Sequence, residues 1–410
     1  MQDVPQHDAR LVGWLSLAQL ISWGSIFYTF ALLMEPVERE LGLTRAQSSL
    51  AFSLALLAEG LLAYPVGRWI DRGHERRVMT GGSLLAGVCL TLHASVTSAL
   101  GFYAVWIGLG AAMSAVLYSP AFSVVTRRFP NDFRRAIITM TFLGGLASTV
   151  FIPLTAWLIS HWGWRYALLG LAALHWLVCA PLHALMLRNA PGPLPGSSDR
   201  QETQVTSGVA PYLRSAPFLL IAAFVILMMA VTVALPAHMV SLLRENGLSE
   251  AWVIAVPASI GVIQVLGRLL LFFFEHHFDL HMANRLIPCL IPLGLLALLV
   301  APLSPAMQAW AVLLFVLLYG IGNGMLTIVR GTAMAQYVNR EHVATLNGAL
   351  GLPMALARFG APLTLGLLWT PQSGYTNGLY LLLALGVLGV AALMLAQRHA
   401  ITPIPLQIRR

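Results

Sequence analysis

The sequence predicts an all-α membrane protein with twelve transmembrane helices arranged as two six-helix bundles. Three observations support this fold class. The 410-residue chain is 58% hydrophobic and only 10% charged, whereas a soluble domain carries about 25% charged residues. The apolar residues gather in runs of about 20, the length at which a helix crosses a hydrocarbon core of about 30 Å. A stretch rich in Pro, Gly and Ser divides these runs into two sets of six.

Each apolar run is expected to be a helix, because backbone groups inside a bilayer have no water to bond. A transmembrane barrel would instead show alternating strands of about ten residues. In chain order, the predicted spans cover residues 12–34, 47–69, 78–98, 100–124, 136–159, 165–187, 216–240, 251–274, 285–303, 307–330, 343–369 and 375–396.

The predicted domains follow from the Pro-rich stretch. Residues 1–187 form an N-terminal six-helix bundle, 188–215 a cytoplasmic linker, and 216–410 a C-terminal six-helix bundle. The two halves also resemble each other, since the string that begins at Leu143 and ends at Thr155 recurs weakly between Leu350 and Thr364. Two parallel halves of six spans are typical of secondary transporters.

The basic residues indicate the orientation of the chain in the membrane. All 24 are arginines, and they lie in small groups between apolar runs rather than on one face, so the net charge of +8 does not predict a nucleic-acid partner. With the N-terminus inside, 17 arginines lie on the cytoplasmic side and four outside, namely Arg39, Arg45, Arg165 and Arg244. The positive-inside rule therefore predicts that both termini are cytoplasmic, and we expect a multi-pass protein of a bacterial inner membrane.

The loop after the second span combines an acid with several arginines. It reads Gly67-Arg-Trp-Ile-Asp71-Arg72-Gly73-His-Glu-Arg76-Arg77. An acid at the end of a helix, followed by arginines on a tight turn, can form ion pairs that hold two bundles together in one state. We therefore interpret Gly67, Asp71, Arg72 and Arg76 as a conformational latch; the alternative is that the arginines only fix the topology.

This loop resembles the G-x-x-x-D-R-x-G-x-R-R signature of the major facilitator superfamily. It departs from that pattern because the second Gly comes one residue early and Glu75 lies among the arginines. Trp23-Gly24-Ser25, the string from Glu40 to Arg45, and Ala51-Phe-Ser-Leu resemble the monocarboxylate transporter and oxalate–formate antiporter branch. The resemblance implies two six-helix bundles, a rocker-switch alternation of access, and a carboxylate substrate.

Apart from arginines at the ends of spans that are assigned to the loops, the predicted spans contain four charged residues: Arg268, Arg330, Arg358 and Glu59. A charge at the bilayer centre costs about 2.5–3.5 kcal/mol even on the lenient insertion scale, so such residues are expected to face a cavity or a partner. One acid cannot neutralise three guanidinium groups. The excess positive charge favours a small organic anion, because a guanidinium matches a carboxylate in bidentate geometry.

The three arginines have alternative roles. Gly267-Arg268 resembles the eighth-span string of the oxalate–formate branch, which implies a substrate-binding role for Arg268; a structural pair near the cytoplasmic end is the alternative. Arg358 is interpreted as a second substrate ligand or as the partner of Glu59. Arg330 either binds substrate or extends to the membrane surface.

Glu59 is a candidate proton carrier, and a permanent clamp with an arginine is the alternative. His238 is the other candidate coupling residue, although a hydrogen-bonded packing role is favoured for it. Five further side chains are candidates for lining the substrate cavity, with helix–helix packing as the alternative: Trp23, Tyr28, Tyr64, Asn323 and Asn347.

The sequence offers no cofactor site and no enzyme motif such as HExxH, GxSxG or a P-loop. The segment from Glu275 to His281 holds metal-ligand types without a regular spacing, so no metal is expected. The favoured function is secondary active transport of a small organic anion, with a monocarboxylate as the expected class. Efflux of drug-like or amphipathic compounds is the alternative. Whether transport is coupled to protons stays open. The expected partners are the substrate and the lipid bilayer, and the protein is expected to be a monomer.

Overall fold

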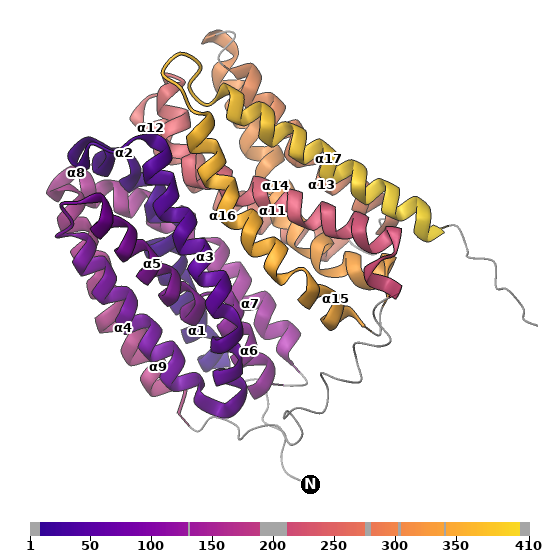
Figure 1. Ribbon diagram of the computed structural model, residues 1–410, viewed down its shortest axis with the longest axis horizontal. Helices are drawn as coiled ribbons and strands as arrows, with labels where there is room; N and C mark the ends of the chain where they lie inside the picture. The colour runs from indigo at the N-terminus through magenta and orange to yellow at the C-terminus, as the bar shows by residue number, and fades with distance from the viewer. Residues whose placement is uncertain are drawn as a thin grey trace, which may run out of the picture. The chain divides into compact units, whose positions relative to one another are not determined.

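The computed structural model describes residues 9–129, 132–188, 211–274, 280–301, 305–339 and 342–401. Over these residues the chain is helical apart from short turns and one isolated bridge between Thr370 and Gly374. Figure 1 shows these residues drawn almost entirely as long helices. The prediction of an all-α fold is confirmed.

Nine helical segments of the described residues are long and apolar enough to cross a membrane. Two of them, Arg45–His93 and Arg135–Met186, contain 49 and 52 residues. At 1.5 Å per residue each would be over about 70 Å long, enough for two crossings. A shorter apolar helix covers Asn284–Val300. Seven segments that cross once, the two long segments that cross twice and this shorter helix together give the twelve spans expected from the sequence.

Glycines in left-handed conformations reverse the chain within both of the long segments. Gly73 has φ 85° and ψ 9°, and Gly163 has φ 80° and ψ 162°. Residues with a Cβ rarely adopt these angles, whereas glycine does so at no steric cost. The two glycines therefore mark the turns between the second and third spans and between the fifth and sixth.

The described chain divides into two compact units. The first comprises Met1–Gly196, Val233–Val265 and Arg358–Gly378; the second comprises Ser197–Thr232, Leu266–Ala357 and Leu379–Arg410. The predicted linker lies mostly outside the described residues, at 189–210, so the division into an N-terminal and a C-terminal bundle stays a prediction.

The first unit contains all helices of the first half of the chain (Figure 1). They are α1 (Ala9–Ser22), η1 (Trp23–Tyr28), α2 (Thr29–Leu41), α3 (Arg45–Trp69), η2 (Ile70–His74), α4 (Glu75–His93), α5 (Ala99–Val116), α6 (Tyr118–Arg128), α7 (Phe133–Gly145), α8 (Ala147–Leu174), η3 (His175–Cys179) and α9 (Ala180–Met186). It also contains parts of α11 (Ala216–Glu245), α12 (Glu250–Phe274) and α16 (Gly351–Leu368).

Aromatic side chains fill the core of the first unit. The rings of Phe30 and Phe52 stack with centroids 4.5 Å apart, and Trp106 meets Phe30 edge-on at 5.1 Å. All three side chains are at most 1% exposed. Such offset and edge-on pairs stabilise the core beyond their buried area.

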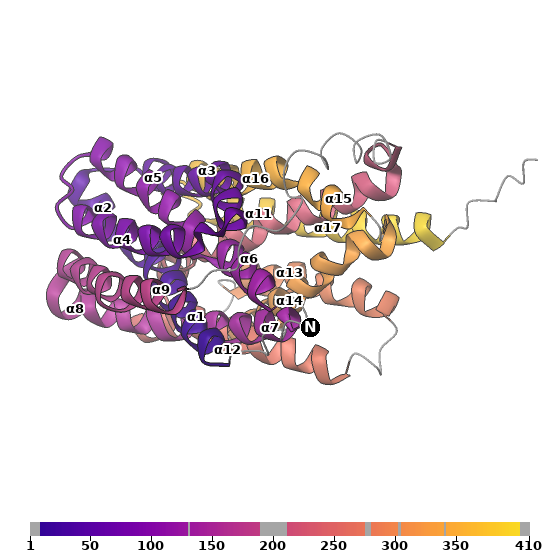
Figure 2. The same cartoon turned by 90° about the horizontal axis from the view of Figure 1, so that it is seen from below.

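Three π-helical turns, η1, η2 and η3, interrupt the helices of this unit. Two of them are joined, because Ser25 Oγ in η1 lies 2.8 Å from His175 Nε2 in η3. Both side chains are fully buried. Figure 2 shows α4 beside α9 on this side of the unit, which the contacts between these helices support.

The second unit contains the remaining parts of α11, α12 and α16 together with α13 (Leu280–Val300), α14 (Pro305–Tyr337), α15 (Val343–Ala349) and α17 (Thr376–Ile401). The helices α13 and α14 pack closely along their length. A buried polar group ties their ends to α17: Asn284 Nδ2 donates to Tyr337 Oη at 2.9 Å, and Gln397 Nε2 donates to the same oxygen at 3.1 Å.

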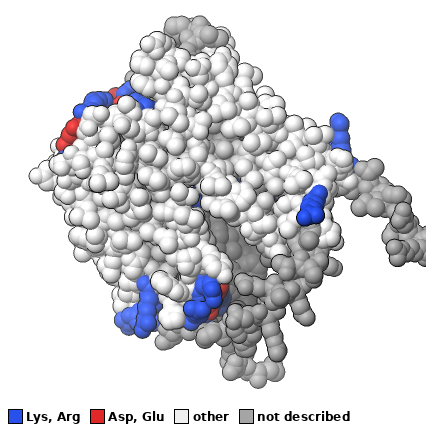
Figure 3. Space-filling view, viewed as in Figure 1, with Lys and Arg blue, Asp and Glu red and all other residues white. Residues whose placement is uncertain are grey.

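Large apolar side chains are exposed on the outer surfaces of the helices, including Leu100 at 79% and Leu177 at 75%. On the face drawn in Figure 3, uncharged side chains cover the broad surface and charged atoms gather in a few groups. Exposure of such an apolar surface to water is unfavourable, whereas contact with lipid tails is not.

Candidate functional site

An ion pair joins two membrane-spanning helices of the first unit. Arg358 on α16 and Glu59 on α3 approach to 2.5 Å between Nη2 and Oε2. Their side chains are 18% and 13% exposed, so the pair is largely shielded from solvent. The structure thus brings together two of the four intramembrane charges, as the pairing alternative predicted. Whether either residue also binds substrate stays a prediction.

Aromatic residues surround the π-helical turn η1 in the same unit. The Trp23 ring lies 5.1 Å from Phe27 and 5.0 Å from Tyr118, measured between centroids. Trp23 Nε1 is buried and has no hydrogen-bond partner among the described residues. A buried indole N–H normally finds an acceptor, so this donor is available to a ligand. Tyr28 is half-buried beside Phe27 at 5.4 Å.

Tyr64 lies in a different environment. It is 64% exposed, and the Arg68 guanidinium carbon lies 5.8 Å from its ring centroid. A cation over an aromatic face at this distance is weakly favourable at an exposed site.

His238 is fully buried and its two ring nitrogens have different partners. Nε2 lies 3.0 Å from the carbonyl oxygen of Pro362, which can only accept a hydrogen bond, so Nε2 carries the proton. Nδ1 then accepts from the Tyr375 hydroxyl at 2.9 Å. Tyr375 in turn accepts from Arg45 Nη1 at 2.6 Å. This arrangement fits a neutral, hydrogen-bonded imidazole, the packing role favoured for His238.

A charge cluster lies at the end of α2, α3 and α11 in the first unit, and we call it the α2–α11 charge cluster. Its members are Glu35, Glu38, Arg45, Arg244 and Glu245. Arg45 pairs with Glu38 at 3.1 Å and with Glu245 at 3.5 Å. Arg244 pairs with Glu35 at 2.5 Å. These contacts connect helices of the first half of the chain with the end of α11.

Local sequence positions Arg45 in this cluster. The Thr44 hydroxyl accepts from the Gln47 amide at 3.2 Å, and the Gln47 side chain accepts from the Thr44 amide at 2.9 Å. This capping box starts α3 at Arg45 and stabilises the helix by about 1 kcal/mol. The guanidinium also lies 5.0 Å from the Trp369 ring. Sequence reasoning treated Arg45 and Arg244 only as topology markers, although Arg45 belongs to the string that resembles the family.

A second charge cluster occurs at the opposite end of α3. Glu75 is 0% exposed, and its carboxylate lies 2.5 Å from Arg128 Nε and 3.5 Å from Arg127 Nη1. Arg127 also donates to the carbonyl oxygen of Ile70. Glu75 therefore fixes the turn between α3 and α4 onto α6. This residue was noted in the sequence only as a departure from the family signature.

The predicted latch residues lie around this turn. Asp71, Arg72 and Arg76 are exposed, and Gly67 is half-buried. Within the part of the chain that the structure describes, Asp71 makes no ion pair. The latch stays a prediction.

The second unit holds the other two intramembrane arginines. Arg268 on α12 donates from Nε to the Gly324 carbonyl oxygen on α14 at 3.4 Å, and Arg330 Nη1 lies 3.8 Å from Met229 Sδ. Asn323 is half-buried on α14, and Asn347 is exposed on α15. Among the described residues no group of His, Cys, Asp and Glu could hold a metal, and residues 275–279 of the segment from Glu275 to His281 lie outside them.

Over the described residues, apolar helices long enough for twelve crossings and an ion pair between two of them are typical of a multi-pass membrane transport protein. Residues 15–362 match the model of the Major Facilitator Superfamily, and the chain belongs to that superfamily.

One relative and two solved structures are similar to this chain, and the two structures have the same fold. The chain is 29% identical to monocarboxylate transporter 13 of Bos taurus over 322 residues, which are 76% of this chain and 69% of that relative. The nucleoside transporter NupG superposes with a TM-score of 0.72 at 15% identity, over 95% of this chain and 98% of that one. A bacterial homologue of the human lysosomal transporter Spinster, inward-facing and unoccupied, gives 0.71 at 18% identity over 96% and 97%.

Proposed function

We propose that the protein is a secondary active transporter that moves a small organic anion across the membrane by alternating access. A monocarboxylate is the substrate class that fits best. The observation that carries the proposal is the ion pair between Glu59 and Arg358 inside two membrane spans. An arginine already bound to a carboxylate in a low-dielectric site can exchange that carboxylate for one on a substrate. The similarity to a bovine monocarboxylate transporter supports the same class.

In the proposed mechanism the substrate carboxylate displaces Glu59 from the Arg358 guanidinium. Arg268 supplies a second guanidinium in the proposed site, and Trp23 donates its unused indole N–H. Tyr28, Tyr64, Asn323 and Asn347 are further proposed lining residues. A hydrogen bond to a charged group contributes about 1.5–3 kcal/mol, so one guanidinium accounts for about 10- to 150-fold in affinity.

Proton coupling follows from the same exchange. When substrate holds Arg358, Glu59 loses its cationic partner, and uptake of a proton neutralises the stranded carboxylate. Return of Glu59 to Arg358 after substrate leaves releases that proton. If the pair instead stays closed throughout the cycle, Glu59 is a structural clamp between α3 and α16.

In the proposed topology both termini lie in the cytoplasm of a bacterium, and the protein acts as a monomer. The positions of the charge clusters are compatible with alternating access in this topology. The α2–α11 charge cluster then closes the outer side and must break when the protein opens outward. Asp71, Arg72, Arg76 and Gly67 act as the latch on the inner side, next to the α3–α4 turn that Glu75 fixes.

The proposal is tested by uptake into proteoliposomes of radiolabelled lactate, pyruvate, formate and oxalate, with and without an imposed pH gradient. We expect saturable uptake of at least one of them and a 10- to 150-fold loss in Arg358→Gln and in Arg268→Gln. Arg285→Gln is the matched control, because Arg285 is an exposed arginine on α13 whose side chain donates through Nε to Gln397 at 2.8 Å.

Glu59→Gln separates the two roles of the acid. A proton carrier predicts that substrate exchange continues while accumulation driven by the pH gradient is lost. A clamp predicts loss of exchange together with a lower unfolding temperature. Uptake of cationic or uncharged amphipathic compounds but of no carboxylate would refute the anion proposal and favour drug-like efflux.

A further inference from the structure

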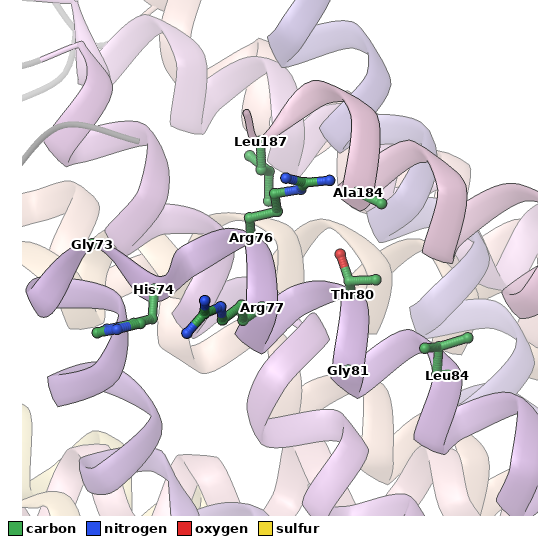
Figure 4. A pocket seen from close by; sticks show the side chains of 9 residues that line it. All are labelled: Gly73, His74, Arg76, Arg77, Thr80, Gly81, Leu84, Ala184 and Leu187. Carbon is green, nitrogen blue, oxygen red and sulfur yellow. The ribbon is translucent and has the colours of Figure 1, made fainter. Parts of the chain in front are cut away.

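A cavity of about 680 Å³ opens beside the turn between α3 and α4, where this turn meets the end of α9. Figure 4 shows its lining side chains. The Arg76 guanidinium extends toward Leu187 and Ala184, and the Arg77 guanidinium points toward His74. On the proposed topology this end of the unit lies at the cytoplasmic surface of the membrane.

The polar half of the cavity carries positive charge, and no acidic residue is among the residues that line it. Glu75, which lies between His74 and Arg76 in the chain, is fully buried and paired with Arg127 and Arg128. Among the described residues neither Arg76 nor Arg77 forms an ion pair with a carboxylate. The Thr80 hydroxyl oxygen, one turn further along α4, is buried and has no hydrogen-bond partner among them. The charge and the unused hydroxyl together suit a phosphate-like anion.

The other half of the cavity is apolar and faces the lipid side of the helix. Leu84 lines the cavity two turns after Arg77, about 10 Å along the helix axis, and is 47% exposed. Val88 and Leu92 continue the exposed apolar face along α4 at 44% and 53%. Gly81 lies between the two halves, and an ideal Cβ built there would meet nothing within 4 Å. An occupant that fills both halves is therefore an amphiphile with an anionic head.

We propose that this cavity binds one anionic phospholipid, with the phosphodiester on Arg76 and Arg77 and an acyl chain along Leu84. A soluble anion would use only the polar half and leave the apolar face unoccupied. A zwitterionic lipid would bring a third positive charge next to the two arginines. The inference is independent of the transported substrate.

The test measures lipid binding to the full-length protein by native mass spectrometry, with phosphatidylglycerol and phosphatidylcholine titrated separately into detergent micelles. Each arginine near an anionic lipid contributes about 1 kcal/mol, so Arg76→Gln/Arg77→Gln should bind phosphatidylglycerol about 30-fold more weakly. Gly81→Leu should reduce binding at unchanged charge because its side chain fills the cavity. The matched control is Arg135→Gln/Arg398→Gln, which removes two exposed arginines from α7 and α17.

Selective weakening in the first two variants, with the control at wild-type affinity, supports the site. Equal weakening in the control would overturn it, because the attraction would then come from net charge alone. Displacement of phosphatidylglycerol by equimolar inorganic phosphate would also overturn it, because a soluble anion would then be the occupant. Unfolding temperatures measured in parallel identify any variant that is misfolded, and Gly81→Leu keeps the proposal testable if the double variant does not fold.

Discussion

Arg45 is predicted to hold one end of the first unit closed, and its replacement should open that end measurably. In Arg45→Gln the side chain loses its charge, its contacts with Glu38 and Glu245, and its hydrogen bond to Tyr375. Glutamine is too short to restore both carboxylate contacts. The two carboxylates then remain near each other without their shared cation.

The magnitude follows from the burial of the three groups. The side chains of Arg45 and Glu38 are 9% and 11% exposed, whereas Glu245 is 29% exposed. Removing one partner of a fully buried pair costs about 3–5 kcal/mol. Since water reaches Glu245 and offsets part of this cost, we expect about 2 kcal/mol. That free energy corresponds to an opening equilibrium about 30-fold larger.

Hydrogen–deuterium exchange of the protein in nanodiscs measures this opening directly. Peptides covering residues 38–48 and 369–376 should exchange about 30-fold faster in Arg45→Gln, while the aromatic core around Trp106 keeps its protection. Arg39→Gln is the control, because Arg39 is 77% exposed, so that water screens its contact with Glu35 at 3.2 Å and limits it to at most about 1 kcal/mol. Exchange within twofold of wild type, or an equal change in both variants, would refute the assignment of Arg45 as the residue that closes this end.

Three further predictions concern stability. Glu75→Gln should lower the free energy of unfolding by about 3 kcal/mol, because Arg127 and Arg128 lose their buried counterion. Arg72→Gln, at an exposed site, should change the free energy of unfolding little. Denaturant titration of both variants measures the difference. Burial raises the pKa of the Tyr375 hydroxyl, so the stability it contributes is complete below its unfolded pKa of about 10 and is lost as the pH rises further. Melting temperatures between pH 8 and 11 should therefore fall above pH 10 in the wild type and less steeply in Tyr375→Phe; equal slopes would contradict this. Gly163→Ala should destabilise the protein by about 1–3 kcal/mol, because φ 80° is unfavourable for alanine. Gly170→Ala is the control and should not destabilise it, because the added Cβ would meet only Leu158 at 4.0 Å. A thermal melt showing the reverse order would contradict the assignment of Gly163 to a turn.

Hydropathy predicted the helices well because burial in lipid requires long apolar runs. The helix boundaries were less accurate where local capping decides them. The third span was predicted to reach residue 98, but α4 ends at His93. Ser98 instead caps the next helix, α5, by accepting from the Gly101 backbone amide at 3.2 Å. The eleventh span was predicted as one run, and the structure divides it into α15 and α16 at Leu350.

The sequence predicted which residues belong to the candidate site, but it could not predict which of them contact each other. Glu59 and Arg358 stand out because each is the only charge of its type in a long apolar run. Their contact joins positions 299 residues apart, and no pattern within either helix encodes it. Arg45 and Glu75 were overlooked as site residues for the opposite reason. Charges near loops indicate topology in a sequence, and only tertiary packing shows that these two are buried.

The π-helical turn η1 also determines where this chain can tolerate the deletion of a residue. A π-turn accommodates one more residue than an α-turn over the same rise. A single deletion between residues 23 and 28 can therefore be absorbed by conversion of the turn to an α-helix, so that α1 and α2 keep the faces they now present. The same deletion elsewhere in the span would rotate every following side chain by about 100°. Because Ser25 in η1 bonds His175 in η3, such a shortened chain would lose one buried polar contact and gain a regular helix.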